Sequence, residues 1–301
     1  MRKFHIALIA STLLISGCVK ELDSLIQDPT IQQGLAKTGL SQSHISSIAG
    51  ISKGVASASE DFTPEQEYYI GRTVSANILS NYKLYNNAAA TKYINQIGYQ
   101  LANHSDMPVT FGGYHFAILD SSEINAFAAP GGFIFITRGL LRCASNEDEV
   151  AAIIAHEIAH ITHAHALSAI KSSRWSDLGV NIATEIAKKH TKSTLNNLLT
   201  IYEGSIKDIT NTMINSGYSK SQEYEADKSA TDILISSGYN PTSLIAMLES
   251  MDKKLTVNSG GFGSTHPSPK DRIDSLTALK LSESKIHANR VKRFKSTLSK
   301  I

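Results

Sequence analysis

The chain has 301 residues, with 29 Lys and Arg against 27 Asp and Glu, and 42% of its residues are hydrophobic. This composition can fill a hydrophobic core, so it excludes an acidic disordered protein and a collagen-like repeat. Two cysteines are too few for a small disulfide-stapled domain. The formal net charge of +2 comes from Arg2 and Lys3, and it gives no indication of a nucleic-acid partner.

Residues 1–18 predict a lipoprotein signal peptide that is not part of the folded domain. Arg2 and Lys3 precede an apolar run over residues 4–15, which is too short to span a bilayer but has the length of a signal-peptide core. The run ends in Leu-Ile-Ser-Gly-Cys, which resembles the bacterial lipobox. The resemblance implies a lipid anchor at Cys18 that holds the protein at a membrane. The alternative is a secreted chain cut near Gly17.

The next segment, residues 19–60, has few aromatic residues and predicts a tether of low structure. The folded domain is expected over residues 62–283 and opens with a helix. Thr63 can cap that helix, Pro64 suits its first turn, and Gln66 completes a capping box. Two helices are expected here, over residues 64–82 and 87–103.

Three segments rich in aromatic and β-branched residues predict strands, and they cover residues 114–120, 124–129 and 132–138. Pro-Gly-Gly at residues 130–132 supplies the turn of a hairpin. We therefore expect an α+β fold that is mostly helical and contains a small antiparallel sheet.

From Ser145 onward the pattern is helical almost to the end of the chain. One helix is expected to begin at Asn146, and two or more are expected within residues 167–218. Three further helices are expected, the first over residues 220–236, the second after Pro241 and the third over residues 270–282. Residues 284–301 predict a basic C-terminal tail, which is either a solvated terminal helix or a contact with anionic lipids.

Residues 156–160 form the pattern His-Glu-x-x-His. Positions four apart share one face of a helix, so His156 and His160 can reach one tetrahedral ion. Glu157 lies about a quarter turn away, where its carboxylate can contact a metal-bound water without being a ligand. Apolar residues precede the motif, so it is expected in the core, and it predicts one zinc ion.

A catalytic zinc needs a third protein ligand and an open fourth position. His163 shares a face with His156 but lies about 10 Å along the helix. We therefore expect His163 and His165 at the surface or behind the ligands. Glu223 and Asp227 also share a helix face, so Glu223 can bind the metal while Asp227 orients a histidine. Taken alone, acids at this spacing usually form a solvated stripe.

With these motifs the chain resembles the zinc metalloproteases of peptidase family 48. The resemblance covers residues 62–282, and its ordered blocks are Thr-Pro-Glu-Gln-Glu at 63–67, Asn-Ala-Phe-Ala at 125–128, the His-Glu-x-x-His motif, Glu-Tyr-Glu-Ala-Asp at 223–227 and Thr-His-Pro at 265–267. It implies a gluzincin-type domain with Glu223 as the third ligand. The chain has neither the spanning helices nor the tetratricopeptide repeats of larger members, so it is most similar to the short periplasmic lipoprotein branch.

The resemblance also implies a substrate-binding edge strand formed by Asn125, Ala126, Phe127 and Ala128, which would pair with an extended polypeptide. The alternative for this strand is plain core packing. The Gly-rich loop over 259–263 precedes His266, which can donate to an oxyanion, occlude the metal in a latent state, or simply serve as a turn residue before Pro267.

The function implied is a zinc-dependent endopeptidase that hydrolyses unfolded or misassembled polypeptides in the bacterial cell envelope. Glu157 would act as general base. The lipid anchor would place the protein on the periplasmic face, and Val19 after Cys18 favours the outer membrane over the inner one. Two alternatives are a latent protease that acts mainly as a chaperone-like assembly factor, and a non-catalytic zinc-binding lipoprotein. The sequence does not predict an oligomeric state.

Overall fold

The structure is a computed structural model, and it describes residues 62–168, 204, 206–254, 266, 268–285, 287–299 and 301. The predicted signal peptide with Cys18, the tether and the Gly-rich loop lie outside the described residues. The described residues fall within one compact unit that covers Phe62–Ile170 and Glu203–Ile301. None of the described helices is both long enough and apolar enough to span a membrane.

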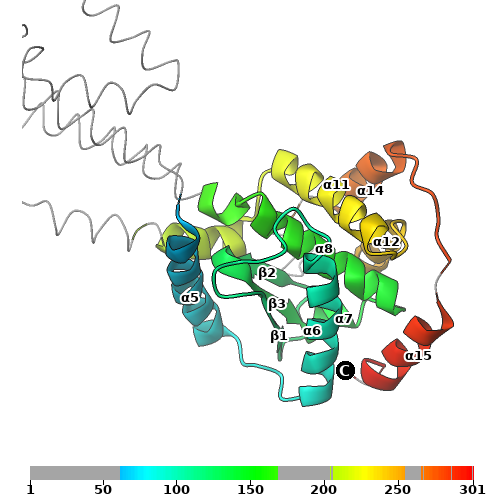
Figure 1. The fold of residues 1–301 in the computed structure, drawn as a ribbon, viewed down its shortest axis with the longest axis horizontal. Coiled ribbons are helices and arrows are strands. Elements are labelled where there is room, and N and C mark those ends of the chain that lie inside the picture. The colour runs from blue at the N-terminus through cyan, green and yellow to red at the C-terminus, as the bar shows by residue number, and fades with distance from the viewer. Residues whose placement is uncertain are drawn as a thin grey trace, which may run out of the picture. The chain divides into compact units, whose positions relative to one another are not determined.

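The sheet has three strands, β1 (His115–Leu119), β2 (Ala126–Ala129) and β3 (Phe133–Thr137), in the order β1-β3-β2 (Figure 1). The three predicted strand segments are confirmed, but the prediction of an antiparallel sheet is wrong for one of the two pairs. β2 and β3 are antiparallel across the turn at 130–132, whereas β1 and β3 are parallel. The sheet is therefore mixed.

The parallel pair arises because the short segment 120–125 crosses the end of β3 instead of forming a hairpin. Thr137 at the end of β3 fixes the position of this crossing segment. Its hydroxyl donates to the carbonyl oxygen of Glu123 at 2.6 Å, and its backbone N–H donates to the carbonyl oxygen of Asn125 at 3.1 Å. Gly139 leaves room for it, since a Cβ there would lie 2.1 Å from the carbonyl oxygen of Glu123. Neither condition is visible in the strand pattern of the sequence.

Helices cover both faces of the sheet. Ile134 and Ile136 of β3 pack into the core formed with α6 (Ala88–Ala102) and α8 (Glu147–Thr162). Phe135 points to the other face and packs with α5 (Pro64–Asn81). Because side chains alternate along a strand, one short β3 serves both layers. Other described helices include α7 (Arg138–Leu141), α11 (Lys220–Ser236), α12 (Ser243–Lys254), α14 (Pro269–Ala278) and α15 (Ala288–Thr297), with short turns η1 (Pro130–Gly132) and η2 (Thr212–Ser216).

The main helices begin where their capping residues predict. Thr63 and Gln66 form a capping box at the start of α5. The side chain of Asn146 accepts a hydrogen bond from the backbone N–H of Glu149 at the start of α8. Ser219 and its partner three residues later form a second capping box at the start of α11. Each of these bonds satisfies a backbone N–H that has no partner within the helix.

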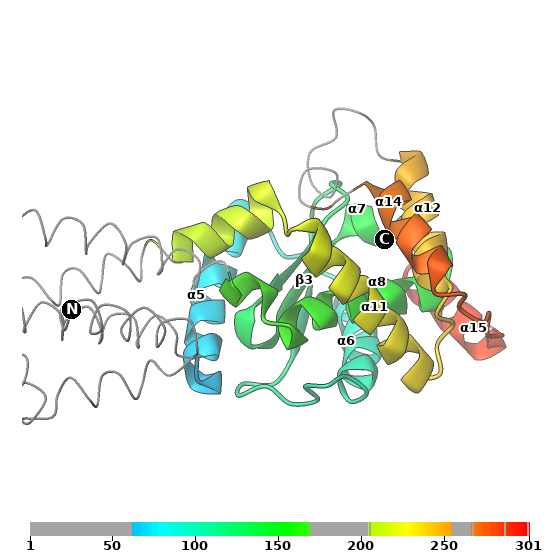
Figure 2. The same cartoon turned by 90° about the horizontal axis from the view of Figure 1, so that it is seen from above.

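The first turn of α8 is held by α15, which packs against α6 and α8 (Figure 2). Glu147 and Asp148 are fully buried in that turn. Arg293 donates from Nε to Oε2 of Glu147 at 2.9 Å, and Arg290 donates from Nη1 to Oδ1 of Asp148 at 3.1 Å. The segment predicted as a basic tail therefore contains a helix that is docked on the domain and neutralises two buried acids.

Candidate metal centre

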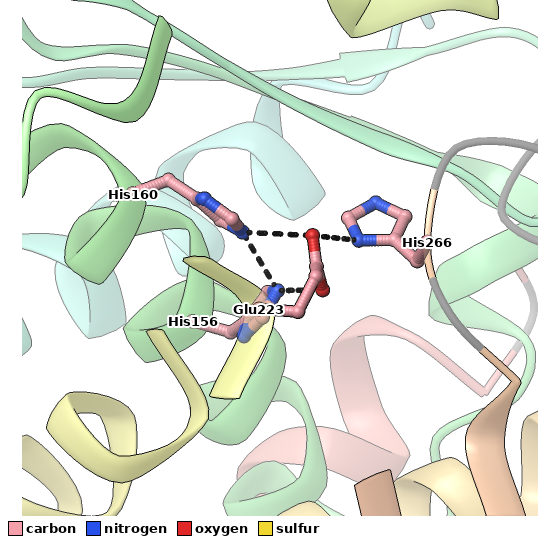
Figure 3. Close-up of side chains that lie close together, drawn as sticks. All are labelled: His156, His160, Glu223 and His266. Atoms are coloured by element: carbon pink, nitrogen blue, oxygen red, sulfur yellow. Dashed lines mark hydrogen bonds and ion pairs between the residues drawn. The ribbon is translucent and has the colours of Figure 1, made fainter. Parts of the chain in front are cut away.

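Helices α8 and α11 pack side by side and bring the motif residues together. His156 and His160 come from α8, Glu223 comes from α11, and all three side chains are buried. Figure 3 shows Glu223 between the two imidazoles and His266. The Nε2 atoms of His156 and His160 are 3.0 Å apart, and each lies 3.5 Å from a carboxylate oxygen of Glu223.

These distances suit a tetrahedral zinc site. Two bonds of about 2.0–2.1 Å at a tetrahedral angle place the two ligand atoms roughly 3.3 Å apart. The three observed separations of 3.0, 3.5 and 3.5 Å lie close to that value. Oε2 of Glu223 is buried and has no hydrogen-bond partner among the described residues, and Nη1 of Arg272 lies 3.4 Å from it. Two imidazoles and one carboxylate are donors that zinc takes in catalytic sites, so the donor set fits the zinc ion that the sequence predicts.

His266 supplies a fourth donor to this cluster from the segment that precedes α14. Its Nδ1 lies 2.8 Å from Oε1 of Glu223, and its side chain is only 4% exposed. The ligand-type atoms of His156, His160, Glu223 and His266 all lie within 4.8 Å of one another. His266 therefore points into the centre.

Glu157 lies beside the cluster and is 2% exposed. It lines a cavity of about 10 Å³ together with Ala126 and Ala128 of β2, Tyr218 and His266. Burial raises the pKa of Glu157 to about 7, with His156 opposing the shift and the negative Glu223 adding to it. Its position beside the cluster places the carboxylate where a general base is required.

Asp227 lies where the sequence suggests, with Oδ1 at 3.0 Å from Nδ1 of His156. One residue that sequence reasoning missed is Arg272 of α14, which is 1% exposed. It donates to both carboxylate oxygens of Asp227, from Nε at 2.8 Å and from Nη2 at 2.5 Å, and its Nη1 lies 3.4 Å from Oε2 of Glu223. Burial alone would raise the pKa of Asp227, but Arg272 and His156 together lower it.

His163 and His165 do not belong to the cluster of ligand-type atoms. His165 is buried, and its Nδ1 lies 2.8 Å from Nδ1 of His160, so it contacts the ring nitrogen that points away from the centre. Nε2 of His165 lies 3.1 Å from Oε2 of Glu225. His163 contacts the hydroxyl of Ser229 at 2.7 Å. Contacts of this kind fix the orientation of a metal-binding imidazole.

The predicted substrate strand is β2, which lies at the edge of the sheet and next to Glu157. Ala126, Phe127 and Ala128 line the same small cavity as the base. Asn125 is buried, and its Oδ1 accepts a hydrogen bond from the N–H of Ala126 at 2.9 Å. The turn η2 packs against β2. The structure thus places the strand beside the base, and pairing with a substrate stays a proposal.

A His-Glu-x-x-His helix whose further donor is a glutamate from a second helix defines a His₂Glu metallopeptidase type of site. Comparison with known proteins agrees with this class. Residues 88–280 match Peptidase family M48. The chain therefore belongs to peptidase family M48.

Three relatives illustrate the similarity. The Beta-barrel assembly-enhancing protease of Escherichia coli (strain K12) is 27% identical over 225 residues, which is 72% of this chain and 44% of that protein. Metalloprotease LoiP of the same organism is 27% identical over 191 residues, covering 63% of this chain and 70% of LoiP. Mitochondrial metalloendopeptidase OMA1 of Arabidopsis thaliana is 28% identical over 170 residues, covering 55% of this chain and 31% of OMA1. The chain spans less than half the length of the first of these relatives.

Proposed function

We propose that the chain is a zinc-dependent endopeptidase of the bacterial cell envelope that hydrolyses unfolded or misassembled polypeptides. The observation that carries this proposal is the joint placement of two imidazoles, one glutamate and the buried base Glu157 beside the edge strand β2. Membership of peptidase family M48 supports it. One Escherichia coli relative is named as a protease that enhances β-barrel assembly, which supports a role in the envelope, and another is named as a metalloprotease, which supports the chemistry.

The residues divide the chemistry among them. Zinc held by His156, His160 and Glu223 would supply a Lewis acid that polarises the scissile carbonyl and lowers the pKa of water. Glu157 takes a proton from the attacking water and gives it to the leaving amine. Asp227 fixes the orientation of the His156 ring through its Nδ1 atom.

The edge strand accounts for the class of substrate. An extended polypeptide that pairs with β2 is gripped through its backbone, largely irrespective of its side chains. Unfolded or misassembled envelope proteins expose such backbones, whereas folded domains do not. Lipidation at Cys18 would hold the enzyme on the periplasmic face of a membrane, and we propose the outer membrane.

One specific observation favours a second candidate, a latent protease that acts mainly as a chaperone-like assembly factor. His266 contacts Glu223 at 2.8 Å, and the cavity beside Glu157 measures only about 10 Å³, which is too small for a peptide. In a latent enzyme His266 would occupy the fourth position on the metal. The variant His266→Ala separates the roles, because turnover rises if His266 occludes the site, falls if it donates to an oxyanion, and is unchanged if it is only a turn residue.

The proposed function is tested with the purified full chain, by measuring zinc by mass spectrometry and cleavage of unfolded casein. The wild type should bind one zinc ion and cleave casein. Glu157→Gln should keep the zinc and lose cleavage, because it removes the base without removing a ligand. Glu249→Gln, an exposed change on α12, is the matched control and should cleave normally. Full activity in Glu157→Gln, or a wild type without zinc, would contradict the proposal.

A further inference from the structure

Tyr218 places a buried hydroxyl group next to the metal centre, and the mechanism above does not use it. Its ring stacks on the imidazole of His160, with ring centroids 4.3 Å apart and planes at 21°. Its hydroxyl is buried and finds no hydrogen-bond partner among the residues that the structure describes. A buried polar group in this condition is unfavourable, and a phenylalanine would stack equally well. Packing on His160 therefore explains the ring but not the hydroxyl.

The position of Tyr218 indicates what the hydroxyl can contact. The residue lines the same cavity as Glu157 and as Ala126 and Ala128 of β2. A polypeptide paired with β2 would run past the residues that line this cavity, so its scissile carbonyl would come next to both the base and the phenol. The backbone on each side of Tyr218 is fixed, because the preceding Gly217 closes a turn and the following residue caps α11.

We propose that Tyr218 is a catalytic residue whose hydroxyl donates a hydrogen bond to the oxygen of the scissile carbonyl as negative charge develops there. This inference rests on the proposed peptidase function. As the oxygen of water bonds to the carbonyl carbon, the π electron pair of the carbonyl moves to its oxygen and the proton of water passes to Glu157. Tyr218 keeps its own proton throughout. A preorganised donor aimed at developing charge in a site that excludes water is among the largest contributors to catalysis.

The first test uses Tyr218→Phe, which keeps the ring and removes only the hydroxyl. We expect kcat for a quenched fluorescent peptide to fall by about 10²–10³-fold, the effect of removing one oxyanion donor. KM and zinc content should stay unchanged. Tyr99→Phe on α6, where the side chain is 48% exposed, is the matched control and should behave as wild type. Tyr218→Leu also removes the stacked ring and should in addition weaken zinc binding, because His160 loses its support.

The second test does not depend on turnover. A peptide phosphonamidate mimics the tetrahedral transition state, whereas a peptide thiol binds zinc without presenting that oxygen. Calorimetry should show that Tyr218→Phe lowers the affinity for the phosphonamidate by a factor similar to the loss in kcat. The affinity for the thiol should be unchanged. After zinc is removed by a chelator, the urea midpoint of Tyr218→Phe should be no lower than that of wild type, since an unpartnered polar group has been removed.

The outcomes separate this inference from the proposed function. Retention of kcat and of phosphonamidate affinity in Tyr218→Phe would overturn it and leave Tyr218 as a packing residue. If the wild type binds zinc but cleaves no peptide, the proposed function fails and the calorimetric comparison alone decides the role of Tyr218. An equal loss of both inhibitors would also overturn the inference, because it would indicate a general disturbance of the site.

Discussion

A substitution of Arg272 tests how strongly its ion pairs stabilise the buried acids of the metal centre. Its guanidinium bonds both carboxylate oxygens of Asp227 and lies 3.4 Å from Glu223. All three side chains are almost completely buried. Arg272→Met keeps most of the aliphatic length and removes the charge, so two buried carboxylates lose their arginine. Removing one partner of a buried ion pair destabilises a protein by about 3–5 kcal/mol, and we expect a loss of this size at pH 7.

The loss should depend on pH in a definite direction. Because the pKa of Asp227 is lowered in the folded protein, its stabilising effect is present above the ordinary value of 3.8 and disappears as the pH falls through the folded value. Arg272→Met lacks the ion pair with Asp227 at every pH. The difference between wild type and Arg272→Met should therefore be largest near neutral pH and shrink below about pH 4.

The assay is urea unfolding of the chelated, metal-free protein, followed by circular dichroism. Asp227→Asn combined with Arg272→Met should be more stable than Arg272→Met alone, because the uncompensated carboxylate is gone. Lys220→Met breaks the exposed ion pair between Lys220 and Asp271 and is the control, with no measurable loss expected. The reasoning is refuted if Arg272→Met loses no more stability than Lys220→Met, or if the double variant is no better than the single one.

Two further predictions concern stability. Burial raises the pKa of Glu157 from 4.5 to about 7, so the folded metal-free protein binds more protons than the unfolded chain in this range and its stability falls as pH rises. The free energy of unfolding of metal-free Glu157→Gln should therefore exceed that of wild type by up to about 3 kcal/mol at pH 8, and the difference should disappear below pH 4.5. The measurement is urea unfolding across this pH range, and parallel stability profiles of the two proteins would contradict the prediction. Gly139→Ala would place a Cβ 2.1 Å from a carbonyl oxygen of the crossing segment and should cost about 1–3 kcal/mol of stability in thermal unfolding. Gly204→Ala, where no atom of the described residues lies within 4 Å of the added Cβ, should cause no such loss, and equal behaviour of the two variants would exclude the steric explanation.

Local rules predicted much of the fold and the centre of the site. The caps at Thr63 and Asn146 act within one turn of the chain, so the start of each helix can be inferred from a few neighbouring residues. The spacing of His156 and His160, and of Glu223 and Asp227, follows from the helical repeat alone. α8 and α11 pack together in the structure, and the two pairs lie at their contact.

The features that sequence reasoning missed depend on contacts between distant segments. The parallel pairing of β1 depends on Thr137 and Gly139 accommodating a crossing segment, and no strand pattern encodes that crossing. Arg272 contacts a residue 45 positions away, and Tyr218 stacks on an imidazole from another helix. An arginine on an otherwise polar helix has no local signal that distinguishes a buried ion pair from a solvated side chain.

Buried acids lie in the first turn of α8 and, on α11, beside its metal-binding histidines, and the C-terminal helices supply arginines to both sets. At the first turn, Glu147 and Asp148 meet Arg290 and Arg293 of α15, while the acids around the metal centre meet Arg272 of α14. An unpaired buried acid is costly, so these arginines stabilise the first turn of α8 and the acids of α11 that face its histidines. The match to peptidase family M48 ends at residue 280, before α15 begins. The α15 contact therefore lies outside the matched region, and we expect it to affect catalysis through the position of α8.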